Sequence, residues 1–415
     1  MSRRLKTILL LFTFLTLAFV IAGGMQVKAG SDKDGAYRQL QVYQEVLSRI
    51  RSDYVEEPNI ATVTDGALHG LLESLDANSS YLSPAEYQQY KQQKPTNGVI
   101  GAQVSKRYGY AAVVAVVPGG PAENAGVENS DIIEAIEGSS THEMSLSAIR
   151  NLLQGQPGSV VNISVVRPRK AQPVKISITR EVVKEPPVQA RMMEGQIGYI
   201  RPDGFSKGRS HEIAARVQEL TRQGATRFVL DLRGSASGEM EEGVATANLF
   251  LNHGTIGYVQ GQNYPRQDFA ADPSKAIIAL PLVVIVNRTT AGPAELVAGA
   301  VLENARGDIV GDKTFGEGSI TKLFPMPDGS ALVLSIAKYH TPSGKAIQDT
   351  AITPNISVAD STDDFLAPDD GPDVETGPHT KKDQQDDQLH RAIEVLKDKP
   401  QKVVELRMLT TAASA

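Results

Sequence analysis

The sequence contains no cysteine. This absence excludes disulfide bonds, thiolate metal sites, a cysteine nucleophile and a lipid anchor on cysteine. Histidine is scarce as well, and no two of the seven histidines have the i, i+3 or i, i+4 spacing of a metal-binding pair on a helix. The usual reagents of protein catalysis are therefore absent or isolated, and we expect neither a metal ion nor another cofactor.

A strong excess of charge is also lacking. The 415 residues include 42 basic and 48 acidic side chains, which gives a formal net charge of −6. This balance does not favour nucleic acid or an anionic membrane surface as a partner. Hydrophobic residues make up 41% and charged residues 22%, as in folded proteins, and the length predicts two to four domains.

The N-terminus carries the longest apolar run of the chain. Three basic residues within the first six positions precede an apolar stretch from Ile8 to Ala22. This pattern predicts that residues 1–29 are a cleaved signal peptide or that residues 8–25 remain as a signal-anchor in the inner membrane. Either alternative places the rest of the chain outside the cytoplasm, with contact to a membrane only through this segment.

The pattern of apolar residues divides the remaining chain into five segments. Helical spacing characterises the first segment, short β-branched runs with glycine turns the second, and alternating strands and helices the third. The fourth is rich in acidic residues, proline and glycine, which indicates a disordered linker, and the fifth is amphipathic. In chain order the predicted segments are 30–96, 97–183, 184–359, 360–388 and 389–415.

The first segment contains an apolar stripe with helical spacing, formed by Leu40, Tyr43, Leu47, Ile50 and Tyr54. Such a stripe packs on its own domain or pairs with a second copy of the chain. Both alternatives stay open from the sequence.

Two motifs of the second segment resemble a PDZ domain of the bacterial type. Residues 120–127 read GPAENAGV and residues 131–138 read DIIEAIEG. The resemblance implies binding of a peptide C-terminus, which adds a strand to a sheet edge while backbone amides of a loop hold its carboxylate. By the same resemblance this loop comprises Val99, Ile100, Gly101 and Ala102.

Five motifs in one order resemble the carboxyl-terminal processing peptidases, also called tail-specific proteases. They are SLDANSSYLSP at 74–84, the PDZ unit, DLR at 231–233, GDKTFG at 311–316 and AKYHTPSG at 337–344. The resemblance implies an α/β fold with a mainly parallel-sheet peptidase core, an inserted PDZ domain and an N-terminal helical region. It also implies serine–lysine chemistry, which needs no cysteine, histidine or metal.

The residues that this chemistry needs are replaced. By resemblance, the nucleophilic serine corresponds to Gly292, the lysine base to Glu317 and the glutamine that orients the lysine to Thr321. The residue after the nucleophile, whose N–H stabilises the oxyanion, is Pro293, which has no N–H. A glycine followed by a proline is still a favourable helix start.

These replacements predict a pseudopeptidase that binds protein C-termini or a partner without cutting. The candidate partners are an active relative of the family or a second copy of the chain. The alternative is an active serine-type endopeptidase with a relocated hydroxyl nucleophile; the candidates are Ser235, Ser237, Thr289, Thr290 and Ser319. The Asp231 and Arg233 pair after a β run is predicted to form a structural bridge rather than a metal site.

Overall fold

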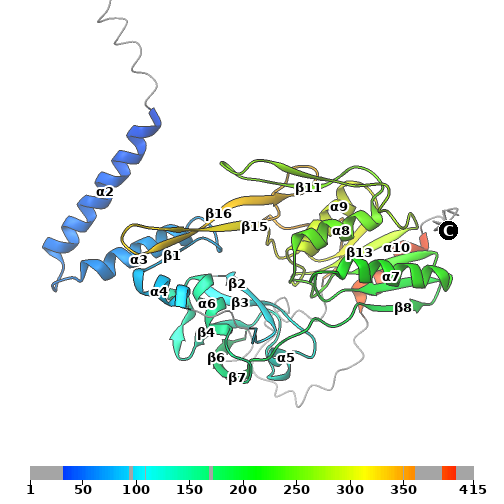
Figure 1. The fold of residues 1–415 in the computed structure, drawn as a ribbon, viewed down its shortest axis with the longest axis horizontal. Helices are drawn as coiled ribbons and strands as arrows, with labels where there is room; N and C mark the ends of the chain where they lie inside the picture. Colours follow the sequence, from blue (N-terminus) through cyan, green and yellow to red (C-terminus); the bar gives the residue numbers. More distant parts are fainter. Residues whose placement is uncertain are drawn as a thin grey trace, which may run out of the picture. The chain divides into compact units, whose positions relative to one another are not determined.

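The computed structural model describes residues 31–92, 97–107, 109–167, 172–348, 350–359 and 386–398. The chain divides into two compact units, residues 1–68 and 69–415, which are described separately (Figure 1). The predicted signal segment 1–29, residues 360–385 of the predicted linker and residues 399–415 lie outside the described part. Within that part, no helix has the length and apolar character needed to cross a membrane.

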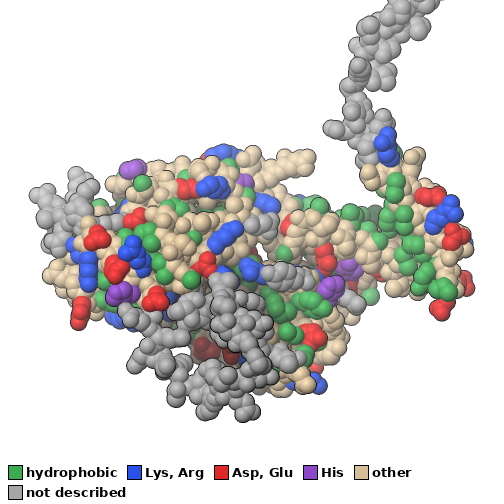
Figure 2. Space-filling model, turned by 180° about the vertical axis from the view of Figure 1, so that it is seen from behind, with side chains coloured by type: hydrophobic (Ala, Val, Ile, Leu, Met, Phe, Trp, Pro, Cys, Tyr) green, Lys and Arg blue, Asp and Glu red, His purple; other side chains and the backbone are tan. Residues whose placement is uncertain are grey.

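The first unit is helical. Helix α2 (Ser31–Asp53) is followed by α3 (Ile60–Glu73), which continues into the second unit. Four residues of the predicted apolar stripe lie on α2 and Tyr54 directly follows it, but Leu40 and Tyr43 are 62% and 40% exposed rather than packed on their own domain. Figure 2 shows hydrophobic and charged side chains side by side on this helix.

The PDZ region forms an antiparallel sheet in the order β2-β3-β4-β6-β7, with β5 (Ser139–Ser140) beside β4. Helix α6 (Leu146–Leu153) covers it, and Leu146, Ile149 and Leu153 are buried in its core. Strand β2 has β3 as its only partner in this sheet and therefore forms an edge. The strands are β2 (Ala102–Arg107), β3 (Tyr110–Val116), β4 (Ile132–Ile136), β6 (Val160–Val166) and β7 (Val174–Thr179).

The α/β core is built on a sheet in the order β17-β14-β13-β10-β9-β8, parallel except for β8. Alternate residues of the central strands point to opposite faces of the sheet, and helices cover both faces. The strands are β8 (Gln189–Met193), β9 (Ile197–Arg201), β10 (Arg227–Asp231), β13 (Leu282–Val286), β14 (Asp308–Gly311) and β17 (Ile356–Ser357).

Helices cover the two faces of this sheet unequally. One face packs against α7 (Arg209–Arg222), α8 (Met240–Phe250) and α9 (Pro293–Glu303). The other face, with Tyr199 and Val283, packs against the C-terminal helix α10 (Asp387–Asp398). The predicted linker boundary at 388 is therefore displaced, because α10 begins at Asp387 and is capped by the Asp386 carboxylate, which accepts the Leu389 N–H at 3.0 Å.

A third, antiparallel sheet was not expected from the sequence. Strands β1, β16, β11 and β12 pair in this order, and β15 joins β16. Strand β1 interrupts a region predicted as helical, because burial of Tyr81 and Leu82 and pairing with β16 outweigh local preference. The strands are β1 (Ser80–Leu82), β11 (Thr255–Gln260), β12 (Gln267–Ala270), β15 (Ser319–Pro325) and β16 (Ala331–His340); α4 (Pro84–Gln92) follows β1.

The predicted fold class is confirmed. The chain combines N-terminal helices, an antiparallel PDZ sheet and a mixed α/β core around a parallel sheet.

Candidate functional site

The first element of the site is the start of α9. Gly292 stands directly before this helix with φ 60° and ψ −120°, a conformation that favours glycine. Pro293 occupies the first helical position, where its missing N–H costs the helix nothing. The helix start is thus intact, while position 292 offers no reactive side chain and position 293 no amide donor.

The fully buried carboxylate of Glu295 joins this helix start to the loop before β15. Its Oε2 accepts the backbone N–H of Gly292 at 3.0 Å and that of Glu317 at 2.8 Å. Its Oε1 accepts the Gly316 N–H at 2.8 Å and the Thr314 hydroxyl. One oxygen thus brings the two positions matched to serine and lysine side by side.

Burial also sets the protonation of Glu295. It raises the pKa of this carboxyl to about 7, against the lowering effect of the hydrogen bonds from Thr314, Glu317, Gly316 and Gly292. The central hydrogen-bond acceptor of the site therefore titrates near neutral pH.

The side chain of Glu317 points to the PDZ region. Its Oε1 lies 3.1 Å from the Arg150 guanidinium of α6. Its Oε2 is buried and has no hydrogen-bond partner among the described residues. Thr321 lies exposed on β15, two residues after Ser319. The position matched to the orienting glutamine is therefore not part of this site.

The five hydroxyls considered as relocated nucleophiles make local hydrogen bonds. Ser235 donates to the Pro202 carbonyl at 2.5 Å and Ser237 to Glu185 at 2.9 Å. Thr289 donates to Asn287 at 2.7 Å, and Thr290 donates to the Leu232 carbonyl at 2.9 Å. The Ser319 hydroxyl accepts the Asn78 amide at 2.9 Å. Four of the five thus give their proton to a structural acceptor.

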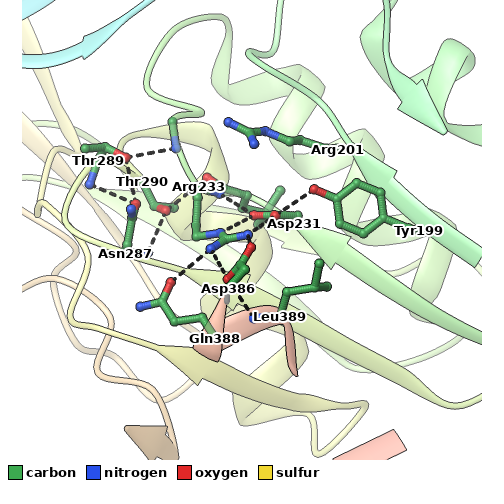
Figure 3. A network of polar contacts seen from close by, with 12 residues as sticks. Tyr199, Arg201, Asp231, Arg233, Asn287, Thr289, Thr290, Asp386, Gln388 and Leu389 are labelled. Atoms are coloured by element: carbon green, nitrogen blue, oxygen red, sulfur yellow. Dashed lines mark hydrogen bonds and ion pairs between the residues drawn. The ribbon is translucent and has the colours of Figure 1, made fainter. Parts of the chain in front are cut away.

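The Asp231 and Arg233 pair forms a structural bridge, as expected. Arg233 donates to both oxygens of Asp231, at 2.9 and 2.6 Å, and to both oxygens of Asp386, at 2.8 and 2.7 Å (Figure 3). Tyr199 donates to Asp231 at 2.8 Å. Burial alone lowers the pKa of Arg233, but the hydrogen bonds and charges of the two carboxylates outweigh it and raise the pKa.

Across the described ranges, no group of three or more histidine or carboxylate side chains is placed to hold a metal ion.

The loop matched to carboxylate binding precedes the edge strand β2. Val99 exchanges both backbone hydrogen bonds with Glu181, at 2.8 and 3.0 Å, so its N–H is already used. The buried Ile100 and Gly101, the latter at φ 73°, direct no backbone N–H to an acceptor within the described part of the chain. The amides that can hold a ligand carboxylate are therefore those of Ile100 and Gly101, next to Ala102 at the start of β2.

The PDZ region packs on the loops of the site. Val114 and Ala115 of β3 form a buried apolar cluster with Ala236 and Ala291, and Phe315 packs against it. The Arg107 guanidinium of β2 lies 4.6 Å from the centre of the Phe315 ring. Ala291, directly before Gly292, and Phe315, two residues before Glu317, are thus in contact with the PDZ sheet.

An α/β core with an inserted PDZ domain packed on its helix-start loops is a peptidase architecture, and known proteins share it. Residues 196–358 match peptidase family S41 and residues 113–167 match a PDZ domain. Carboxyl-terminal-processing proteases of Picosynechococcus sp. and Synechocystis sp. are 34% and 32% identical to this chain. These alignments cover 68% and 74% of this chain and 69% and 74% of the relatives.

A solved structure agrees with these sequence matches. The photosystem II D1 C-terminal processing protease is 26% identical, with a TM-score of 0.62, over 77% of this chain and 92% of that chain. The chain belongs to peptidase family S41 and is a homologue of the C-terminal processing proteases.

Sequence reasoning missed two residues that organise the site. Glu295 is not among the residues that the sequence predicts for the site, although its position three residues after Gly292 is that of a capping carboxylate. No feature of the sequence marks Arg150 as part of the site, because a single arginine on a helix is usually solvated.

Proposed function

We propose that this chain is a pseudopeptidase, a C-terminal processing protease scaffold that binds protein C-termini or a partner protein without cleaving them. The glycine at position 292 carries the proposal. Apart from its chain neighbours and the adjoining helix backbone, no heavy atom of the described residues lies within 4 Å of where a Cβ would stand, so no other described side chain reaches into the place of the nucleophile.

Three further replacements support it. Pro293 cannot donate to an oxyanion, and loss of one such donor lowers the rate by about 10²–10³. Glu317 is engaged with Arg150, and Thr321 lies exposed on β15. Restoring the serine alone would therefore still leave the reaction without its base, the residue that orients the base and the oxyanion donor.

The binding half of the proposal is supported by the PDZ region. An edge strand, β2, follows a loop in which the N–H groups of Ile100 and Gly101 lack a described acceptor. This arrangement suits strand addition with capture of a terminal carboxylate.

Cleavage assays on the full chain test the catalytic half. With an unfolded substrate that ends in apolar residues, we expect no specific products from the wild type or from the Gly292→Ser variant. Specific cleavage that persists through further purification contradicts the proposal.

One observation favours the alternative, an active endopeptidase with a relocated nucleophile: the buried Oε2 of Glu317 has no described partner and could accept a proton. Ser319 is the hydroxyl nearest to it in sequence. If cleavage is found, single alanine variants of Ser235, Ser237, Thr289, Thr290 and Ser319 identify the nucleophile. Activity that survives all five points to a contaminating protease.

We further propose that the protein acts outside the cytoplasm, beside an active family member or a second copy. The basic and apolar N-terminal segment supports export. Fusion of residues 1–29 to an alkaline phosphatase without its own signal tests this, since the phosphatase gains activity only when exported. Affinity purification of the full chain from membranes tests for the active relative.

A further inference from the structure

A basic side chain, that of Arg150, lies between helix α6 and the edge strand β2, in the space called the groove below. The Nη2 atom of Arg150 donates to the Val104 carbonyl of β2 at 3.1 Å. The same atom lies 3.1 Å from Oε1 of Glu317. Arg150 therefore spans from α6 to the strand edge, where the N–H of an added strand would need an acceptor.

A second basic residue repeats this arrangement further along β2. The Lys106 ammonium donates to the Met144 carbonyl at 2.9 Å and pairs with Glu73 of α3; its side chain is only 8% exposed. Each of the two cations thus holds a backbone carbonyl of the PDZ region. Each is also neutralised by a carboxylate that comes from outside the PDZ sheet.

The contact between Arg150 and Glu317 is open to exchange. The two side chains are 38% and 20% exposed, and the second carboxylate oxygen of Glu317 has no described partner. Ion pairs that keep contact with solvent contribute little net stability, so a ligand can replace one member at low cost. Loss of Glu317 from Arg150 without a replacing carboxylate is unfavourable, because the charge of the arginine is partly desolvated.

The direction of the ligand follows from the position of the loop. A terminal carboxylate held by the amides of Ile100 and Gly101 lies at the start of β2, so the ligand runs antiparallel to this strand. Its side chains two or three residues before the end then lie near Val104 and Arg150.

We infer that the groove selects C-terminal peptides with an acidic side chain two or three residues before the end, and that Glu317 holds the place of this carboxylate until the ligand arrives. The inference rests on the proposed peptide-binding function. It gives the residue at the former lysine position a role as an internal competitor and makes Arg150 the specificity-determining residue.

Peptide binding to the full chain tests this. The probes are fluorescent decapeptides with a free C-terminus and an apolar last residue, with one Glu placed at each of the five preceding positions and a matched Gln peptide for each. We expect Glu at the second or third position before the end to bind about 3–10-fold more tightly than Gln, the range of one ion pair.

Two variants assign the effect. Glu317→Gln removes the competitor and should tighten binding of the acidic peptides about 3–10-fold, while the Gln peptides change less than about 2-fold. Arg150→Gln should abolish the preference for Glu. Glu219→Gln, which removes one member of an exposed ion pair on α7, is the matched control and should leave every affinity unchanged.

The possible outcomes distinguish this inference from the proposed peptide-binding function on which it rests. Binding of free-carboxylate peptides with equal affinity for Glu and Gln at all positions, or a preference that persists in Arg150→Gln, overturns the inference alone. Absence of binding by every peptide overturns the proposed binding function together with it.

Discussion

Arg233 and Arg150 both connect distant segments of the chain through carboxylates, but their surroundings differ. Arg233 lies between Asp231 and Asp386 and is 14% exposed, with Asp231 fully buried. Arg150 meets a single oxygen of Glu317, and both side chains retain contact with solvent. The Arg233 contact is part of the buried core. The Arg150 contact joins the PDZ region to the helix-start loops, and a ligand can replace one of its two members.

The largest effect is expected at the Arg233 contact. Arg233→Met leaves the buried Asp231 without its cationic partner and should lower the free energy of unfolding by about 3–5 kcal/mol. Urea unfolding measures the loss, and hydrogen exchange should increase in α10. Arg216→Met, which removes an exposed ion pair on α7, is the control and should change stability by less than about 1 kcal/mol. Equal effects of the two variants would show that the first contact is no stronger than a surface pair.

A pH effect should distinguish the helix start from both arginine contacts. The pKa of Glu295 is raised from 4.5 to about 7, so the folded state binds a proton more tightly than the unfolded state. Its contribution is complete below pH 4.5 and is lost as the pH rises through 7, by about 3 kcal/mol.

The measurement is the difference in unfolding free energy between wild type and Glu295→Gln from pH 4 to 8, in which the other titrating groups cancel. The wild type should lose stability relative to the variant as the pH rises. A difference that is constant or grows with pH contradicts the raised pKa.

A smaller effect is expected at Gly292. An alanine held at φ 60° and ψ −120°, a conformation outside the left-handed helical region, costs about 1–3 kcal/mol, and no clash adds to this because the site of the Cβ is open. Gly70→Ala in α3, where the space is equally open and φ is not positive, is the matched control and should raise stability by about 0.5–1 kcal/mol. Thermal unfolding of both variants checks the prediction; a neutral Gly292→Ala would mean that the helix start relaxes.

The smallest effect is expected at the Arg150 contact. Glu317→Gln should change the free energy of unfolding by less than about 1 kcal/mol, because both side chains of the pair are partly exposed. A double-mutant cycle with Arg150→Gln measures the coupling directly. A coupling of about 3 kcal/mol or more would place this contact in the same class as Arg233.

The regular parts of this molecule could be predicted from the sequence, since alternating β-branched runs and amphipathic helices fix the parallel core, and glycine turns mark the PDZ strands. The replaced residues at 292, 293 and 317 were also visible, because they stand in continuous motifs. Strand β1 could not be predicted, because pairing with β16 decides its conformation. Arg150 and Asp386 were missed for a related reason: their partners lie 167 and 153 residues away in sequence.

The apolar cluster between the PDZ sheet and the helix-start loops limits how this protein can be divided. Val114 and Ala115 are 3% and 5% exposed, and their neighbours Ala236 and Ala291 belong to the core. A fragment that ends after the PDZ strands would present these side chains to water. A PDZ domain transplanted from a relative would need matching small residues at both core positions, so the two domains form one unit for protein engineering.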